Sequence, residues 1–207
     1  GSVSVLGCNP TREPLKVKRQ VGYLPEKVGF YENLTARENL RFIADLNGIG
    51  YAEANRRADE VLEMVGLTES EVMEKRGPNR KIEKTVGKFS RGMKQRLGIA
   101  EVLIKRPKLV FLDEPTAGLD PKGINQLLDL IEGLPGMGTT VVLSSHQLYQ
   151  VQRVCHNIGI LAKGKMVIQG AIDKLGREAL AGGRFQIEAE TEEPDEKLIN
   201  VIRSIKG

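Results

Sequence analysis

The sequence predicts an α/β fold in which a parallel sheet core carries a helical insert subdomain and a small α+β C-terminal extension. Two apolar runs rich in β-branched residues, KLVFLD at 108–113 and TTVVLSS at 139–145, have the length and composition of buried strands. Helical patterns separate these runs, and buried strands that alternate with helices are typical of a parallel sheet covered on both faces. Further helical patterns gather before residue 106, which indicates the insert.

The first predicted elements are a short strand and a capped helix. RQVGYL at 19–24 has the character of a strand and is closed by Pro25. Thr35 and Glu38 have the spacing of a capping box, in which each side chain bonds the other residue's backbone N–H. We therefore expect a helix over 36–47.

Two further helices are predicted before the first buried strand. Apolar residues recur at three- and four-residue spacing over 52–65, and Ser90 is a favourable N-cap for a helix over 91–105. The basic segment 75–88 between them is rich in turn residues, and we interpret it as a solvated connection.

The second half continues the alternation of strands and helices. Helices are predicted over 124–134 and 147–155, one after each buried strand, and IGILAKGKMVIQG at 158–170 predicts two strands around a tight turn. Beyond that turn we expect a helix, a strand and a helix, over 172–180, 184–190 and 195–205.

The composition is that of a soluble globular protein, with 40% hydrophobic and 28% charged residues among 207. No run approaches the roughly 18 consecutive apolar residues of a membrane-spanning helix, and the first ten residues show no secretory signal. Cys8 and Cys155 lie far apart in the sequence, so we expect reduced thiols rather than a metal site or a disulfide. The net charge of +4 is compatible with a polyanionic partner without indicating one.

Two adjacent carboxylates, Asp113 and Glu114, stand where the strand at 108–113 ends. Ligands of open parallel sheets bind beyond the carboxyl ends of the strands, and Mg²⁺ takes one or two carboxylates plus phosphate oxygens, so Asp113 is a candidate metal ligand. Pro115 biases Glu114 to an extended backbone and ends the strand, so Glu114 is a candidate base for an attacking water. An ordinary exit from a strand is the alternative.

Two other polar features accompany this pair. Ser90 caps a predicted helix and Gly92 lets a ligand approach the backbone, so the unpaired N–H groups of this helix start can hold a phosphate. His146 follows the other buried strand, and beside Asp113 and Glu114 it can contact a terminal phosphate. A plain capped helix and a solvated histidine are the alternatives.

Five segments, in their order along the chain, resemble the motifs of the ATP-binding cassette (ABC) ATPases, and the sequences YLPE and ENLT within them most resemble the drug- and antibiotic-exporter branch. They are YLPE, FYENLTARENL, FSRGMKQR, LVFLDEPTAGLD and SH, at 23–26, 30–40, 89–96, 109–120 and 145–146. The resemblance implies a P-loop NTPase-type sheet core. It also implies a division into four parts. The first is a remnant of the N-terminal core with a Q-loop-like region at 1–34, and the second is a helical subdomain at 35–105. The catalytic α/β core follows at 106–170, and an accessory extension at 171–207.

The resemblance also implies roles for four residues around the carboxylates. Asp113 is expected to hold Mg²⁺, Glu114 to be the catalytic carboxylate of the Walker B motif, and His146 to be the switch histidine. Glu26 stands where the family usually has its Q-loop glutamine, and its carboxylate can still bind Mg²⁺ or a water near the nucleotide.

Segment 89–93 resembles the signature motif, which in this family caps the γ-phosphate of ATP bound to the other subunit. Ser90, Gly92 and Met93 are therefore expected to contact ATP, although FSRGM departs from the usual Leu-Ser-Gly-Gly-Gln. Asp120 ends a D-loop-like stretch and is expected to face the same partner. The implied cofactors are ATP and Mg²⁺, and the implied assembly of the complete protein is a head-to-tail homodimer.

The family's P-loop, G-x-x-x-x-G-K-[ST], does not occur in these 207 residues. The partial match at 159–165 is followed by Met166, which has no hydroxyl for Mg²⁺, and it lies in the predicted strand pair. We therefore expect a cassette that lacks its N-terminal section and is inactive as an ATPase by itself, whereas the complete parent hydrolyses ATP.

Two functions remain open. The first is the ATP-hydrolysing subunit of an ABC-type membrane exporter, cytoplasmic and peripheral on the inner face of the cell membrane, with a transmembrane permease as its partner. The alternative is a soluble ABC-type ATPase that acts on nucleic acid or the ribosome, which the basic segment 75–88 favours modestly. The single cassette without long heptads and the transporter-like segment 26–40 favour the first, so no specific nucleic acid is expected.

Overall fold

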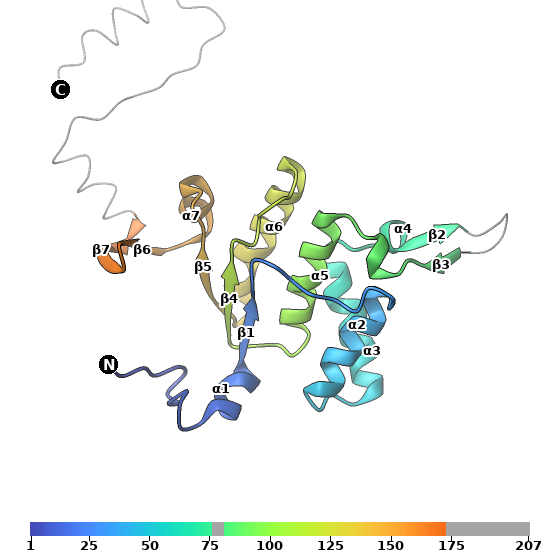
Figure 1. The fold of residues 1–207 in the computed structure, drawn as a ribbon, viewed down its shortest axis with the longest axis horizontal. Helices are drawn as coiled ribbons and strands as arrows, with labels where there is room; N and C mark the ends of the chain where they lie inside the picture. The colour runs from blue at the N-terminus through green and yellow to red at the C-terminus, as the bar shows by residue number, and fades with distance from the viewer. Residues whose placement is uncertain (76–80, 173–207) are drawn as a thin grey trace, which may run out of the picture. The chain divides into compact units, whose positions relative to one another are not determined.

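The computed structural model describes residues 1–75 and 81–172 (Figure 1). Its contacts divide the chain into two compact units, Gly1–Val154 and Cys155–Gly207. The elements expected beyond Ile172 lie outside the described residues. In the part that is described, no helix combines the length and the apolar character needed to cross a membrane.

The first unit is organised around a three-stranded parallel sheet. Its strands β1 (Val21–Leu24), β4 (Leu109–Asp113) and β5 (Thr140–Ser144) lie in the order β1-β4-β5, and the two pairings place Leu24 beside Leu112 and Leu112 beside Leu143. The predicted parallel sheet is therefore confirmed. Because all three strands run the same way, their carboxyl ends share one edge of the sheet.

The two faces of this sheet differ in burial. One face carries Leu24, Val110 and Leu112, which are buried in the main hydrophobic cluster. The other face carries Tyr23 and Val142, whose exposed fractions are 60% and 46%. The expectation of full burial on both faces was wrong for the described residues, because Tyr23 and Val142 stay exposed; β5 alternates between exposed and half-buried positions.

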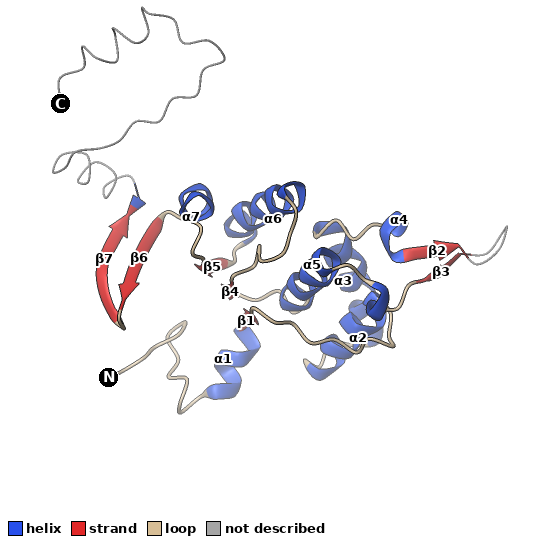
Figure 2. Cartoon of the chain, turned by 45° about the horizontal axis from the view of Figure 1, so that its top comes forward, coloured by secondary structure: helices blue, strands red, loops and turns tan. Residues whose placement is uncertain are grey.

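Outside the helical insert, three α-helices and one 3₁₀ turn of the described residues precede or follow the strands of this sheet. They are α1 (Pro14–Gln20) before β1, α6 (Pro121–Gly133) after β4, the 3₁₀ turn η2 (Leu134–Met137), and α7 (Leu148–Val154) after β5. In the tilted view of Figure 2, α6 and α7 lie on one side of the strands and α1 on the other. The helix α1 was not predicted; it begins at Pro14, whose fixed φ suits a first helical turn.

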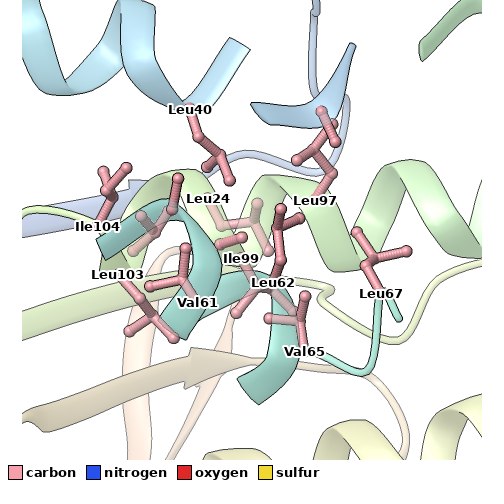
Figure 3. Close-up of a cluster of buried hydrophobic side chains, with 14 of the residues drawn as sticks. Leu24, Leu40, Val61, Leu62, Val65, Leu67, Leu97, Ile99, Leu103 and Ile104 are labelled. Atoms are coloured by element: carbon pink, nitrogen blue, oxygen red, sulfur yellow. The ribbon is translucent and has the colours of Figure 1, made fainter. Parts of the chain in front are cut away.

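The helical insert comprises α2 (Ala36–Leu46), α3 (Tyr51–Met64), α4 (Glu69–Val72) and α5 (Arg91–Leu103). The capping box is confirmed, since the Thr35 hydroxyl accepts from the Glu38 N–H and the Glu38 carboxylate accepts from the Thr35 N–H. Figure 3 shows Leu40 of α2, Leu62 of α3 and Leu97 of α5 in one apolar cluster with Leu24.

A glycine allows α5 to lie close to the sheet. A Cβ at position 98 would lie 2.9 Å from Cδ1 of Leu24 and 3.0 Å from Cγ2 of Val28. No side chain fits there without movement, so Gly98 sets the close approach of α5 to β1 and to the loop that follows β1.

The described residues of the basic segment 75–88 form more regular structure than predicted. Strands β2 (Met73–Lys75) and β3 (Lys81–Glu83) pair antiparallel, and the 3₁₀ turn η1 (Val86–Lys88) follows. The prediction of a purely solvated connection was wrong for these residues, because the ladder satisfies their backbone groups and the Val86 N–H donates to the Leu34 carbonyl at 2.8 Å.

The described part of the second unit is an antiparallel strand pair, β6 (Asn157–Ala162) and β7 (Lys165–Ala171). Lys163 and Gly164 join the strands, with φ values of +50° and +76°, as in the two-residue turns that match strand twist. The predicted hairpin is confirmed, and residues 159–165 do not form a phosphate-binding loop that leads into a helix.

Candidate functional site

The candidate site lies where β4 and β5 end side by side. Asp113 is the last residue of β4 and pairs in register with Ser144, the last residue of β5. The Ser144 hydroxyl donates a hydrogen bond to Oδ1 of Asp113. The two strand ends are thus joined by a polar side-chain contact in addition to the ladder.

Glu114 begins the loop after β4 in an unusual backbone conformation. Its φ is +45°, so the prediction that Pro115 would keep it extended was wrong. Local hydrogen bonds hold it there: its N–H donates to the Ser144 carbonyl at 3.1 Å, and its own carbonyl accepts from the Ala117 N–H at 3.0 Å. A left-handed non-glycine residue costs roughly 1–2 kcal/mol, which these bonds help to offset.

The side chain of Glu114 nevertheless points to the neighbouring strand end. Its Oε1 accepts from the backbone N–H of His146 at 3.0 Å and lies 2.9 Å from the ring atom Nδ1 of His146. The exposed fractions of the two side chains are 24% for Glu114 and 76% for His146. Oε2 of Glu114 has no partner among the described residues, so one oxygen orients the carboxylate and the other is available to accept a proton.

The start of α5 carries the second group of predicted residues. Ser90 is the N-cap, and its hydroxyl accepts from the N–H of Met93 at 3.2 Å. Gly92 faces the loop after β4, since a Cβ at this position would lie 3.3 Å from Cδ2 of Leu119. Ser90 is exposed, so the helix start is open to a ligand or a partner.

The loop from Glu114 to Asp120 contacts this helix start. Gly118 has a φ of +75°, and a Cβ there would lie 2.2 Å from Nε of Arg91, so only glycine fits against that side chain. Asp120 ends the loop as the N-cap of α6, where its Oδ1 accepts from the Gly123 N–H at 2.8 Å. Asp120 is exposed beyond this cap.

Glu26 lies in the loop that follows β1 and Pro25. Since β1 is parallel to β4, this loop leaves the sheet at the same edge as Asp113 and Glu114. Glu26 is exposed and has no hydrogen bond or ion pair with another described residue. Within the described ranges, no group of three or more histidine, cysteine or acidic residues lies together as a metal site.

The oxygen atoms at the strand ends suit Mg²⁺ as part of a larger ligand set. Asp113 offers a carboxylate and Ser144 a hydroxyl, both hard oxygen donors. Mg²⁺ commonly takes one or two carboxylates and completes its shell with phosphate oxygens and waters. Asp113 and Ser144 therefore fit the predicted Mg²⁺ as part of its ligand set, which phosphate oxygens and waters would complete.

Sequence reasoning missed three residues that connect these loops. Ser144 contacts Asp113, and the buried Thr116 donates its hydroxyl to Oε1 of Gln150 at 2.7 Å. Gln150 lies on α7, and no motif in the sequence indicates it, since Thr116 stands 34 residues earlier.

The chain is similar to a known protein family and to several of its members. The sequence profile described as "ABC transporter" matches residues 1–117. The linearmycin resistance ATP-binding protein LnrL of Bacillus subtilis is 35% identical over 205 residues, which is 99% of this chain and 62% of that protein. The bacitracin transport ATP-binding protein BcrA of Bacillus licheniformis is 39% identical over 188 residues, which is 90% of this chain and 57% of that protein. The chain therefore spans about three fifths of the length of these relatives.

Two solved structures have the same fold. The ATP-binding subunit of an ABC transporter is 32% identical, with a TM-score of 0.70 over 86% of this chain and 70% of that chain. A dimeric ATP-binding cassette with bound ADP and phosphate is 24% identical, with a TM-score of 0.70 over 83% of this chain and 73% of that chain. Because its identity is 24%, the second structure shows a shared fold only.

Proposed function

Since this chain belongs to the ABC transporter family, we propose that it is part of an ATP-hydrolysing subunit that powers an ABC-type membrane exporter. The observation that carries the proposal is the contact of Glu114 with His146 beside Asp113, at the joined ends of β4 and β5. The resistance and transport proteins among the relatives support export of antibiotics or similar drugs as the task of the complete protein.

We assign the chemistry of hydrolysis to this cluster of residues. Glu114 accepts a proton from the attacking water at Oε2, while the two bonds of Oε1 to His146 keep the carboxylate in place. His146 contacts the terminal phosphate from its exposed position. Asp113, aided by Glu26, would hold Mg²⁺, which neutralises charge on the phosphate oxygens when bound.

The second group of residues is assigned to the neighbouring subunit's ATP. Ser90, Gly92 and Met93 lie at the start of α5, where the positive end of the helix dipole and the N–H groups of the first turn that the Ser90 hydroxyl leaves free face its γ-phosphate. Asp120 ends the loop that contacts this helix start, so both belong to one surface. The proposed assembly is a head-to-tail homodimer with two ATP molecules between the subunits.

We place the complete subunit in the cytoplasm, bound peripherally to the inner face of the cell membrane through a transmembrane permease. The proposed contact region is the segment around Glu26 together with the helical subdomain at 35–105. The proposed core parts are 1–34 and 106–170, followed by the accessory extension at 171–207.

Affinity purification of the full-length protein from cells, with identification of the proteins that co-purify, tests the proposed association with a permease. We expect a multispan membrane protein to be retained through detergent extraction and washes at about 0.5 M salt, because a packed subunit interface depends little on screened charges. Association with nucleic acid or ribosomes that is lost over the same salt range would contradict the exporter assignment.

The 207-residue chain itself is expected to bind Mg²⁺–ATP at least about a hundredfold more weakly than the full-length protein and to show no appreciable turnover. A phosphate-binding loop supplies most of the N–H and lysine contacts to the phosphates, and residues 1–207 contain no G-x-x-x-x-G-K-[ST] sequence. Titration calorimetry of both proteins measures the difference. Tight binding by the 207-residue chain that disappears in Asp113→Asn would overturn this expectation.

A further inference from the structure

Gln150 of α7 is a fully buried polar residue with all its hydrogen-bonding groups satisfied. Its exposed fraction is 0%. Oε1 accepts from the Thr116 hydroxyl at 2.7 Å and, more weakly, from the Ser145 hydroxyl at 3.4 Å. Nε2 donates to Oε1 of Gln147 at 2.8 Å and to the Tyr149 hydroxyl at 3.1 Å.

The two partners of Oε1, Thr116 and Ser145, come from the two loops that carry the candidate catalytic pair. Thr116 stands two residues after Glu114, in the loop that follows β4. Ser145 stands immediately before His146, in the loop that follows β5, and its hydroxyl also accepts from the Gln147 N–H at 3.1 Å. One buried amide therefore connects both loops at a short distance from Glu114 and His146.

The catalytic pair needs such support. His146 is 76% exposed, and side-chain contacts that are open to solvent are too weak by themselves to hold two loops in one arrangement. Glu114 also has a left-handed backbone, with a φ of +45°, which persists only where its surroundings determine it. A buried side chain with all its hydrogen bonds made holds its neighbours in place, because any shift of a neighbour leaves a buried polar atom without a partner.

We propose that Gln150 is a positioning residue for the Glu114–His146 pair and acts on it through Thr116 and Ser145. The hydrogen bonds of Gln150 fix the distance between the two strand-end loops, and that distance sets the contact of Oε1 of Glu114 with His146. The kinetic part of this inference rests on the proposed ATP hydrolysis, whereas the structural part does not.

Kinetic measurements on the full-length protein test the first part. Gln150→Met keeps the length of the side chain without its amide, and Thr116→Val removes only the hydroxyl. We expect each to lower kcat by about tenfold to a hundredfold with little change in the KM for ATP, since a small misplacement of catalytic groups has effects of this size. The double variant should be no slower than the slower single variant, because both lose the same hydrogen bond.

Nuclear magnetic resonance of the 207-residue chain tests the second part without ATP. The chain has two histidines, His146 and His156, so two ring signals are expected, and His146→Asn assigns them. Gln150→Met and Thr116→Val should both move and narrow the His146 signal while the His156 signal stays in place. Gln152→Met is the matched control, since Gln152 is exposed on the same helix, and it should change neither signal nor rate.

The outcomes separate the alternatives. If Gln150→Met lowers only the Tm, with kcat and the His146 signal unchanged, Gln150 has a packing role and the inference is wrong. Additive effects of the two substitutions would equally exclude a shared hydrogen bond. If the wild-type full-length protein does not hydrolyse ATP, the proposed function fails, but the ring signals still decide whether Gln150 positions His146.

Discussion

Glu114→Gln in the full-length protein is expected to lower ATP turnover by about 10²- to 10⁴-fold and to leave ATP binding intact. The amide has nearly the shape of the carboxylate but cannot take a proton from water. The predicted loss follows from the arrangement of the carboxylate, whose Oε1 is occupied by two groups of His146 while Oε2 has no partner among the described residues.

Steady-state phosphate release and nucleotide binding should be measured on the same preparation. Glu132→Gln is the matched control, because Glu132 is exposed on α6 and should leave turnover unchanged. Full turnover in Glu114→Gln would show that another group accepts the proton. Loss of binding together with turnover would indicate that Glu114 supports the nucleotide rather than the water.

Glu101→Gln is expected to raise the Tm strongly above pH 8 and to leave it nearly unchanged below pH 4.5. Glu101 lies on α5, where burial raises the pKa of its carboxyl from 4.5 to about 8. No hydrogen bond or ion pair with another described residue compensates its charge, since Nζ of Lys105, one turn further on, donates to the Lys18 carbonyl. A glutamine in this position has no charge to bury.

The sign of the change in stability with pH follows from the difference in proton binding between the folded and unfolded states. Because the folded state has the higher pKa, it holds a proton between pH 4.5 and about 8 that the unfolded chain has released. The stability linked to Glu101 is therefore complete below pH 4.5, falls by on the order of 1 kcal/mol per pH unit, and is lost once pH exceeds about 8.

Thermal unfolding of the 207-residue chain, followed by circular dichroism from pH 4 to 9, measures this dependence. Glu132→Gln again serves as the control, because an exposed carboxylate should give a Tm difference that is small at every pH. A Glu101→Gln difference that is equal at pH 5 and pH 9 would mean that the carboxylate is hydrated or paired in the folded protein.

Local rules were sufficient for most of the helices and strands. Thr35 and Ser90 cap α2 and α5 as predicted, since capping depends on neighbours within one turn. The strands ending at Asp113 and Ser144 were found from their apolar runs. The strand pair β2–β3 was missed, because in a basic, turn-rich segment no period of apolar residues indicates which backbone groups will pair.

The sequence predicted the residues of the candidate site better than their arrangement in space. The placement of Glu114 near His146 followed from two strand ends expected on one sheet, and the contact at 2.9 Å agrees with it. The backbone of Glu114 was predicted wrongly, because the pre-proline preference is a local average that the hydrogen bond to the Ser144 carbonyl outweighs. Gln150 carried no recognisable motif, since Thr116, through which it reaches the loop after β4, is 34 residues away in the sequence.

The sequence by itself determined which residues form the caps, the parallel strands and the carboxylate-bearing strand end, because these depend on side chains that are neighbours along the chain. Only the tertiary structure decided that Ser144 bonds Asp113, that Glu114 adopts a left-handed backbone and that Gln150 joins two loops. Those features depend on which polar groups meet when β4, β5 and α7 pack together, and each is stabilised by hydrogen bonds that exist only after the strands have paired.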